Sequence, residues 1–255
     1  MVAMPTLFVS HGSPMMPLED IPAKRFLAGL ATTLPRPTAI LSVSAHWETE
    51  TPEVSAVAQP ETIHDFYGFP PALYALQYPA PGAPALAQRV AELTGAAIDP
   101  IRGLDHGAWT PLLLAYPDAD VPVTQVSIQP HAGPAHQYAL GEALRPLRDE
   151  GVLIVASGGI SHNLREWFRG APGSGPRPWM SEFTEWMAEH LETRDDEAVI
   201  DYRQRAPHAA QNHPRDEHFQ PLHVALGAAT PGVAGKRIHQ SHDMFGVPMD
   251  TYMFA

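Results

Sequence analysis

The chain has 255 residues, of which 44% are hydrophobic and 17% charged, and this globular composition excludes an intrinsically disordered chain. Its formal net charge of −12 argues against nucleic acid as a partner, because phosphate polymers bind to basic faces. The absence of cysteine excludes disulfides and thiolate ligands, and the absence of a long apolar stretch leads us to expect a cytoplasmic protein that does not contact membranes.

Short apolar runs alternate with helical patterns along the whole chain. Runs that are rich in Val and Ile and bounded by Gly, Pro or Ser predict buried strands. These runs cover residues 6–10, 39–45, 121–128 and 152–157. Patterns with helical spacing predict helices at 23–33, 83–93, 135–149, 180–191 and 217–228. Gly95 and Gly151 stand where a glycine usually ends a helix.

Strands that alternate with helices predict an α/β fold, with a central, mostly parallel or mixed sheet that is flanked by helices. We expect a single catalytic domain over residues 1–255, because the one loose stretch, 170–178, is short enough to be a loop. Residues 244–254 alternate weakly and contain Pro248, which favours an edge strand.

Three of the predicted strands lead into histidines. His11 follows the first strand, His46 the second, and His162 follows the fourth after a short SGGIS sequence. Because ligands of such folds bind at the carboxyl ends of strands, the three imidazoles could converge on one point. A single histidine after a strand is more often a hydrogen-bonding residue, but three of them favour a site for Zn, Cu, Fe or Ni.

Aromatic residues cluster in the sequence TIHDFYGFP, residues 62–70. His64, Phe66 and Tyr67 of this segment, with Trp47 of the SAHWE sequence, could form the wall of an aromatic substrate pocket. An alternative interpretation of the segment is a turn that is held in place by its aromatic side chains.

Two further segments carry titratable residues. In DHGAW, either Asp105 or His106 could cap a helix or act in the chemistry. In NHPRDEHFQPL, residues 212–222, Glu217 and His218 stand at the expected start of a helix, where acids are also common for electrostatic reasons. We assign no chemistry to a further group of histidines, namely His131, His136, His190, His208, His239 and His242.

Seven short motifs occur in order along the chain: SHGSP, SAHWE, IHDFYGFP, YPAPG, DHGAW, SHNL and EHFQPL. Together they resemble the class III extradiol ring-cleaving dioxygenases, and most closely the 4,5-DOPA extradiol dioxygenase branch. The resemblance extends from His11 to about Ala228 and therefore covers most of the chain.

The resemblance implies a metal held by His11, His46 and His218, with His162 as the acid–base residue and His106 as a second hydrogen-bonding group. It implies one divalent metal per chain, with Fe(II) for activity. Zn(II) is expected to occupy the same site, because it binds more tightly than Fe(II). The implied substrates are a small aromatic diol and O₂, and the implied assembly is a monomer or homo-oligomer.

The third ligand is a choice between two neighbours. The wider class more often uses a glutamate, and Glu217 precedes His218 directly. Neighbouring residues on a helix point about 100° apart, so only one of the two can reach the metal. The resemblance to the DOPA branch favours His218.

Two other functions remain compatible with the residues alone. A three-histidine site with an open position could also hold the zinc of a hydrolase. The chain could alternatively be a non-catalytic protein that binds a metal or a partner on the same fold, although such a protein would have no need of His162. A substrate carboxylate could be bound by any of four arginines: Arg165, Arg169, Arg177 and Arg215.

Overall fold

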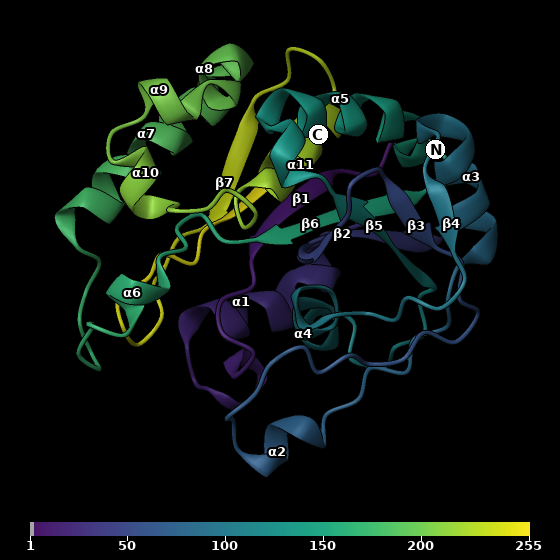
Figure 1. The fold of residues 1–255 in the computed structure, drawn as a ribbon, viewed down its shortest axis with the longest axis horizontal. Helices are drawn as coiled ribbons and strands as arrows, with labels where there is room; N and C mark the ends of the chain where they lie inside the picture. The colour runs from purple at the N-terminus through teal and green to yellow at the C-terminus, as the bar shows by residue number, and fades with distance from the viewer. Residues whose placement is uncertain (1–2) are drawn as a thin grey trace.

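A central sheet of eight strands organises the described part of the chain, residues 3–255 of this computed structural model (Figure 1). The strands lie in the order β4-β3-β5-β2-β6-β1-β8-β7 across the sheet. Their bounds are β1 Thr6–Ser10, β2 Ala39–Glu48, β3 Glu53–Ser55, β4 Ala97–Asp99, β5 Val123–Ile128, β6 Val152–Gly158, β7 Gly235–His239 and β8 Thr251–Phe254.

The middle of the sheet is parallel and its margins are mixed. Strands β5, β2, β6 and β1 pair in parallel, whereas β3 pairs antiparallel with β5, and β8 pairs antiparallel with both β1 and β7. Parallel strands are covered on both faces, which explains why their sequences are continuous apolar runs. The predicted α/β fold with a mixed sheet is therefore confirmed, and the carboxyl ends of the central strands open on one edge.

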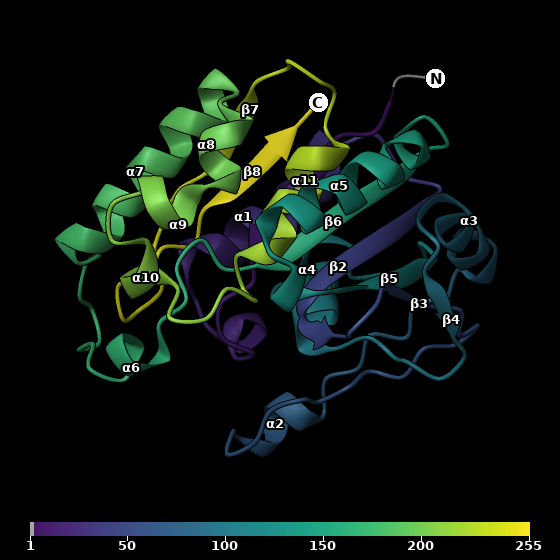
Figure 2. The ribbon, with the colours of Figure 1, turned by 45° about the horizontal axis from the view of Figure 1, so that its top comes forward.

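Helices cover both faces of the sheet (Figures 1 and 2). Leu7 and Phe8, neighbours on β1, belong to two separate hydrophobic clusters because successive strand residues point to opposite faces. The cluster around Phe8 includes residues of α3, α5, α7 and α11, and the cluster around Leu7 includes residues of α1 and α4. The helices are α1 Pro22–Leu30, α2 Pro71–Tyr74, α3 Pro84–Thr94, α4 His106–Ala115, α5 Pro134–Leu144, α6 Leu164–Trp167, α7 Pro178–Thr193, α8 Asp196–Ile200, α9 Tyr202–Arg205, α10 Ala209–Asn212 and α11 Gln220–Ala228.

Within residues 3–255, no helix has the length and apolar character needed to cross a membrane. A long connection, residues 159–219, leaves the end of β6 and returns at α11; we call it the connecting segment. It carries the short helix α6, the long helix α7 and the short helices α8 to α10, and Figure 2 shows this group beside the sheet rather than over its centre.

The structure corrects three predictions. Strand β2 continues to Glu48, so His46 lies within the strand and not after it. Helix α11 begins at Gln220, so Glu217 and His218 precede the helix and are not part of its first turn. The C-terminal strand β8 is not an edge strand, because β7 pairs along its outer side and Pro248 lies before its first residue.

Candidate metal centre

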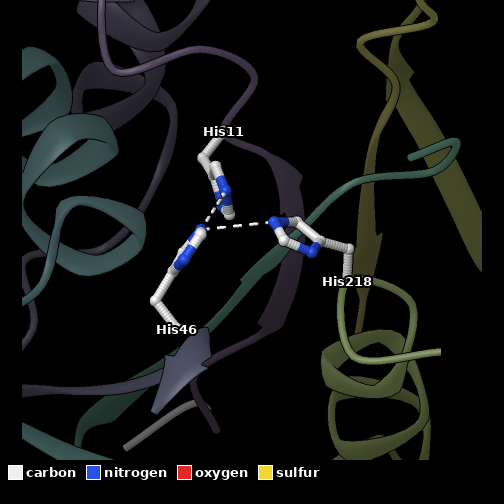
Figure 3. Close-up of side chains that lie close together, drawn as sticks. All are labelled: His11, His46 and His218. Carbon is white, nitrogen blue, oxygen red and sulfur yellow. Dashed lines mark hydrogen bonds between the residues drawn. The ribbon is translucent and has the colours of Figure 1, made fainter. Parts of the chain in front are cut away.

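Three histidines from distant parts of the chain meet at the carboxyl edge of the sheet (Figure 3). His11 directly follows β1, His46 lies near the end of β2, and His218 comes from the last residues before α11. The Nε2 atom of His46 lies 3.0 Å from Nε2 of His11 and 3.2 Å from Nε2 of His218. Nitrogens bound to one metal at about 2.0–2.1 Å would be roughly 2.8–3.4 Å apart, so this spacing fits a shared ion.

The hydrogen bonds of His11 fix which of its nitrogens is free. Its Nδ1 lies 2.9 Å from the Ser157 hydroxyl, which itself donates to the carbonyl of Gly107. Because the hydroxyl proton is used there, Ser157 accepts from Nδ1–H of His11. The Nε2 of His11 therefore presents an unprotonated lone pair to the centre.

Carboxylates lie behind the other two rings, one within hydrogen-bond distance and one just beyond it. Glu217 Oε1 lies 3.0 Å from Nδ1 of His218, and Asp65 Oδ2 lies 3.6 Å from Nδ1 of His46. Each carboxylate favours the proton on the outer nitrogen and leaves Nε2 free, an arrangement that is usual around metal-binding histidines. Three lone pairs facing one another repel, and a cation between them removes the repulsion.

Burial keeps these imidazoles neutral. Desolvation, followed by the neighbouring histidines, holds the pKa of His11 and of His218 well below the usual value. The same causes, with His106 as the main neighbour, lower the pKa of His46 to about 4. Neutral imidazole is the form that binds metal, so the centre is ready to accept an ion at neutral pH.

Two glycines make the close approach possible. A Cβ on Gly107 would lie 2.4 Å from the Ser44 hydroxyl and 2.9 Å from the ring of His46. A Cβ on Gly158 would lie 2.1 Å from the carbonyl oxygen of His218, which accepts a hydrogen bond of 2.9 Å from the next amide, Gly159 N–H. The missing side chains thus let α4 and the connecting segment reach the sheet edge.

His162 lies against the third of these histidines. Its ring stacks on that of His218, with centroids 3.4 Å apart and planes inclined by 13°, and its Nδ1 is 3.6 Å from Glu217 Oε1. Burial, then the nearby His46, lowers the pKa of His162 to about 4. His162 also borders a cavity of about 420 Å³, so a neutral base faces a space of substrate size.

His106 is buried beside the second histidine of the centre, with its ring centroid 3.9 Å from that of His46. Asp65 holds it twice, because Oδ1 accepts from the His106 backbone N–H at 2.9 Å and Oδ2 lies 3.0 Å from its Nδ1. Although burial raises the pKa of Asp65, the hydrogen bonds and charge of His106 outweigh it and bring the value to about 2. Asp65 is thus a carboxylate shared by two histidines of the centre.

The residues predicted to form an aromatic wall are distributed differently. Phe66 reaches the centre, with its ring 5.7 Å from that of His106, whereas Tyr67 is 92% exposed. His64 bonds through Nε2 to the carbonyl of Leu76 and packs within an aromatic turn. Trp47 is buried beneath the Arg102 guanidinium and, as the next strand residue, points away from the face of His46.

The sequence did not reveal several of the supporting residues. Ser157 carries no motif signal, and the sequence presents Glu217 as an alternative ligand or a helix-start acid, not as the partner that orients His218. Asp105 caps α4 through Ala108 N–H, as one interpretation of DHGAW expected. Its buried carboxylate also accepts from the Ser44 hydroxyl and from Arg102, which ties α4 to the strand that carries His46.

Comparison with known proteins agrees with this geometry. Residues 5–254 match the family described as the catalytic LigB subunit of aromatic ring-opening dioxygenase. The 4,5-DOPA dioxygenase extradiol of Beta vulgaris is 44% identical over 261 residues, which span 98% of this chain and 96% of the relative. The protein of the same name from Escherichia coli is 44% identical over 236 residues, which span 88% of this chain and 85% of the relative.

A solved structure has the same fold. The uncharacterized protein JW3007 from Escherichia coli K12 superposes with a TM-score of 0.81 at 34% identity, covering 99% of this chain and 100% of that chain. The resemblance that the seven motifs indicated is therefore confirmed. The chain belongs to the LigB family and is an aromatic ring-opening dioxygenase of the extradiol class.

Proposed function

We propose that this protein opens the ring of a catechol-type, DOPA-like aromatic with O₂, using one divalent metal held by His11, His46 and His218. The convergence of three Nε2 atoms carries the proposal, because each of these rings has its other nitrogen turned toward a hydrogen-bond acceptor. We infer that Fe(II) supports activity and that Zn(II) can occupy the same three nitrogens. The whole chain, residues 1–255, would act as one catalytic domain.

The metal would supply a positively charged centre that binds the two catechol oxygens and O₂ together and lowers the pKa of the hydroxyls. His162 would accept a proton from a catechol hydroxyl, because its imidazole is neutral at pH 7 and borders the cavity. The same nitrogen could later return the proton to the product. His106, held by Asp65 and packed against His46, would offer a second hydrogen bond at the centre.

Glu217 has an orienting part in this proposal, not that of a third ligand. Its Oε1 holds Nδ1 of His218, while Nε2 of that ring is the atom that faces His46. A carboxylate behind a ligating imidazole raises the basicity of the ring and fixes its direction.

Oxygen uptake tests the proposal directly. The purified chain would be stripped of metal, reloaded anaerobically with Fe(II), and mixed with a panel of catechols in an oxygen electrode. We expect uptake that depends on both Fe(II) and a catechol, with a new absorption band from the ring-opened semialdehyde product. No uptake with any catechol would overturn the proposal. The same protein loaded with Zn(II) should bind metal without consuming O₂.

A further inference from the structure

The cavity of about 420 Å³ beside His162 has a charged wall as well as a catalytic one. Arg165 and Arg215 both border it, together with Glu217. Because His162 stacks directly on His218, the cavity begins one ring away from the candidate metal centre. A group attached to a catechol ring at that centre can therefore extend toward these arginines.

The two arginines differ in how far their charge is already neutralised. Arg215 lies 3.2 Å from a carboxylate oxygen of Glu48 and 3.5 Å from one of Glu217. Arg165 forms no ion pair and no side-chain hydrogen bond with any of the residues that the structure describes. Its neighbour Glu166 is occupied by Arg169 at 2.8 Å and Arg177 at 3.7 Å.

This unpaired guanidinium matters because the chain as a whole carries a net charge of −12, which repels anions. The unpaired guanidinium of Arg165 can attract an anion at the cavity despite this net charge. Guanidinium groups bind carboxylates through two parallel hydrogen bonds. Of the four arginines that the sequence left open, Arg169 and Arg177 do not border the cavity, and Arg215 is neutralised.

We propose that Arg165 binds a carboxylate on the side chain of the catechol substrate and so makes the enzyme prefer anionic over neutral or cationic catechols. This inference rests on the proposed function for the position of the ring, and it adds the residue that selects the side chain. The shared cavity wall of Arg165 and His162 is the observation that carries it.

The test compares three probes that share the catechol ring: 3,4-dihydroxyphenylpropionate, which is anionic, 4-methylcatechol, which is neutral, and dopamine, which is cationic. Binding would be measured by calorimetry on the Zn(II)-loaded protein, so that no turnover is needed, and KM would be measured with Fe(II). Arg165→Gln removes the charge. Arg169→Gln, an exposed arginine four residues further on that does not border the cavity, is the matched control for net charge.

We expect Arg165→Gln to weaken binding of the anionic probe by about tenfold, with little change for 4-methylcatechol and equal or tighter binding of dopamine. The loss should shrink at high salt, since an exposed charge is screened. Equal effects of the two substitutions, or equal losses for all three probes, would overturn the inference. Binding of none of the catechols to the wild-type protein would instead count against the proposed function.

Discussion

Two regions of the protein build one centre in different ways. The sheet supplies His11, directly after β1, and His46 of β2; both strands pair on both sides, and His11 N–H donates to the Gly158 carbonyl at 3.0 Å. The connecting segment supplies His162 and His218 from irregular chain, which is anchored by single hydrogen bonds such as His162 N–H to the Asn212 carbonyl. The sheet thus contributes two nitrogens of the candidate centre, and the connecting segment contributes the third nitrogen and the proposed base.

The connecting segment packs into the same hydrophobic cluster as the sheet, through residues such as Phe183 and Phe219, and it also has polar anchors close to the centre. Arg203 pairs with Asp216 and donates to the carbonyl of His213, which holds the turn that leads to His218. His213 itself is buried and bonds through Nε2 to the carbonyl of Ile160. These polar contacts lie within the connecting segment, so variants of the two regions can be compared in the following experiments.

The largest effect is expected from removing one nitrogen of the centre. His11→Ala and His218→Ala should each leave two ligands and lower metal affinity by more than about a hundredfold, although they come from different regions. Metal content after dialysis, measured by elemental analysis, checks this. His208→Ala, at an exposed histidine of the connecting segment, is the control. Wild-type metal content in either ligand variant would contradict the ligand set.

The next effect separates binding from catalysis within the connecting segment. His162→Ala should keep the metal but lower kcat by roughly 10²–10⁴-fold, because acid–base catalysis contributes about that much. Since burial lowers the pKa of His162 to about 4, the wild-type rate should fall as the pH drops toward that value. The pH–rate profile of the variant should not show this fall. An unchanged kcat would move the proton transfer to another residue, with His106 the first to examine.

A smaller effect should distinguish the carboxylates behind His218 of the connecting segment and behind His46 of the sheet. Glu217→Ala removes the acceptor of His218 at 3.0 Å, whereas Asp65→Ala removes a contact to His46 of 3.6 Å. We expect about 10–100-fold weaker Zn(II) binding in the first variant and a smaller loss in the second. Glu217→Gln keeps an acceptor oxygen and should retain most of the affinity. Zn(II) affinities are measured by competition with a chelator. A larger loss for Asp65→Ala than for Glu217→Ala would show that Glu217 does not orient His218.

The junction between the regions can be tested by adding one methyl group. Gly158→Ala places a Cβ against the carbonyl of His218 and should destabilise the protein by about 1–3 kcal/mol in urea unfolding, because backbone must move. Gly29→Ala is the contrast, since nothing lies within 4 Å of that position in α1, and it should stabilise the helix by about 0.5–1 kcal/mol. If Gly158→Ala unfolds with the same free energy as the wild type, the contact between Gly158 and His218 is not tightly packed.

The last experiment concerns a carboxyl at the β8 side of the sheet and is read as a change of stability with pH. Burial raises the pKa of Asp250 to about 7 from its ordinary 3.8, despite Arg237 at 3.4 Å, with Glu185 adding to the rise. The folded state therefore holds this proton more tightly than the unfolded chain, so the resulting stability is full below pH 4 and is lost as the pH rises toward 7. The difference in unfolding free energy between wild type and Asp250→Asn should follow this course. A difference independent of pH would refute it.

The part of the candidate site that the sheet carries was easier to predict from the sequence than the part on the connecting segment. Strands β1 and β6 are buried on both faces, so their apolar runs predicted the location of each strand correctly. The three-residue strand β4 is largely exposed and has no hydrophobic pattern. The sequence predicted an edge strand at the C-terminus because Pro248 lies within the segment. That proline stands outside the paired residues, and the outer strand β7 had given no signal of its own.

The connecting segment shows why its half of the site was harder to predict. The apolar pattern after residue 218 indicated a helix, but the carbonyl of His218 bonds to Gly159, and the helix begins only at Gln220. The geometry that gives Glu217 its orienting role depends on this turn. The spacing of His11, His46 and His218 contains no local pair, so only the folded chain or the resemblance of the motifs could bring them together.

The distances along the chain between the three nitrogens have a consequence for how the protein acquires its metal. His46 is separated from His11 by 35 positions and from His218 by 172, so no short stretch contains the complete set. An unfolded or half-synthesised chain offers scattered single imidazoles, which hold ions weakly. With the proposed ligands, the complete site would form only when the last quarter of the polypeptide has docked, and the finished fold, not the nascent chain, would then select among competing cellular ions.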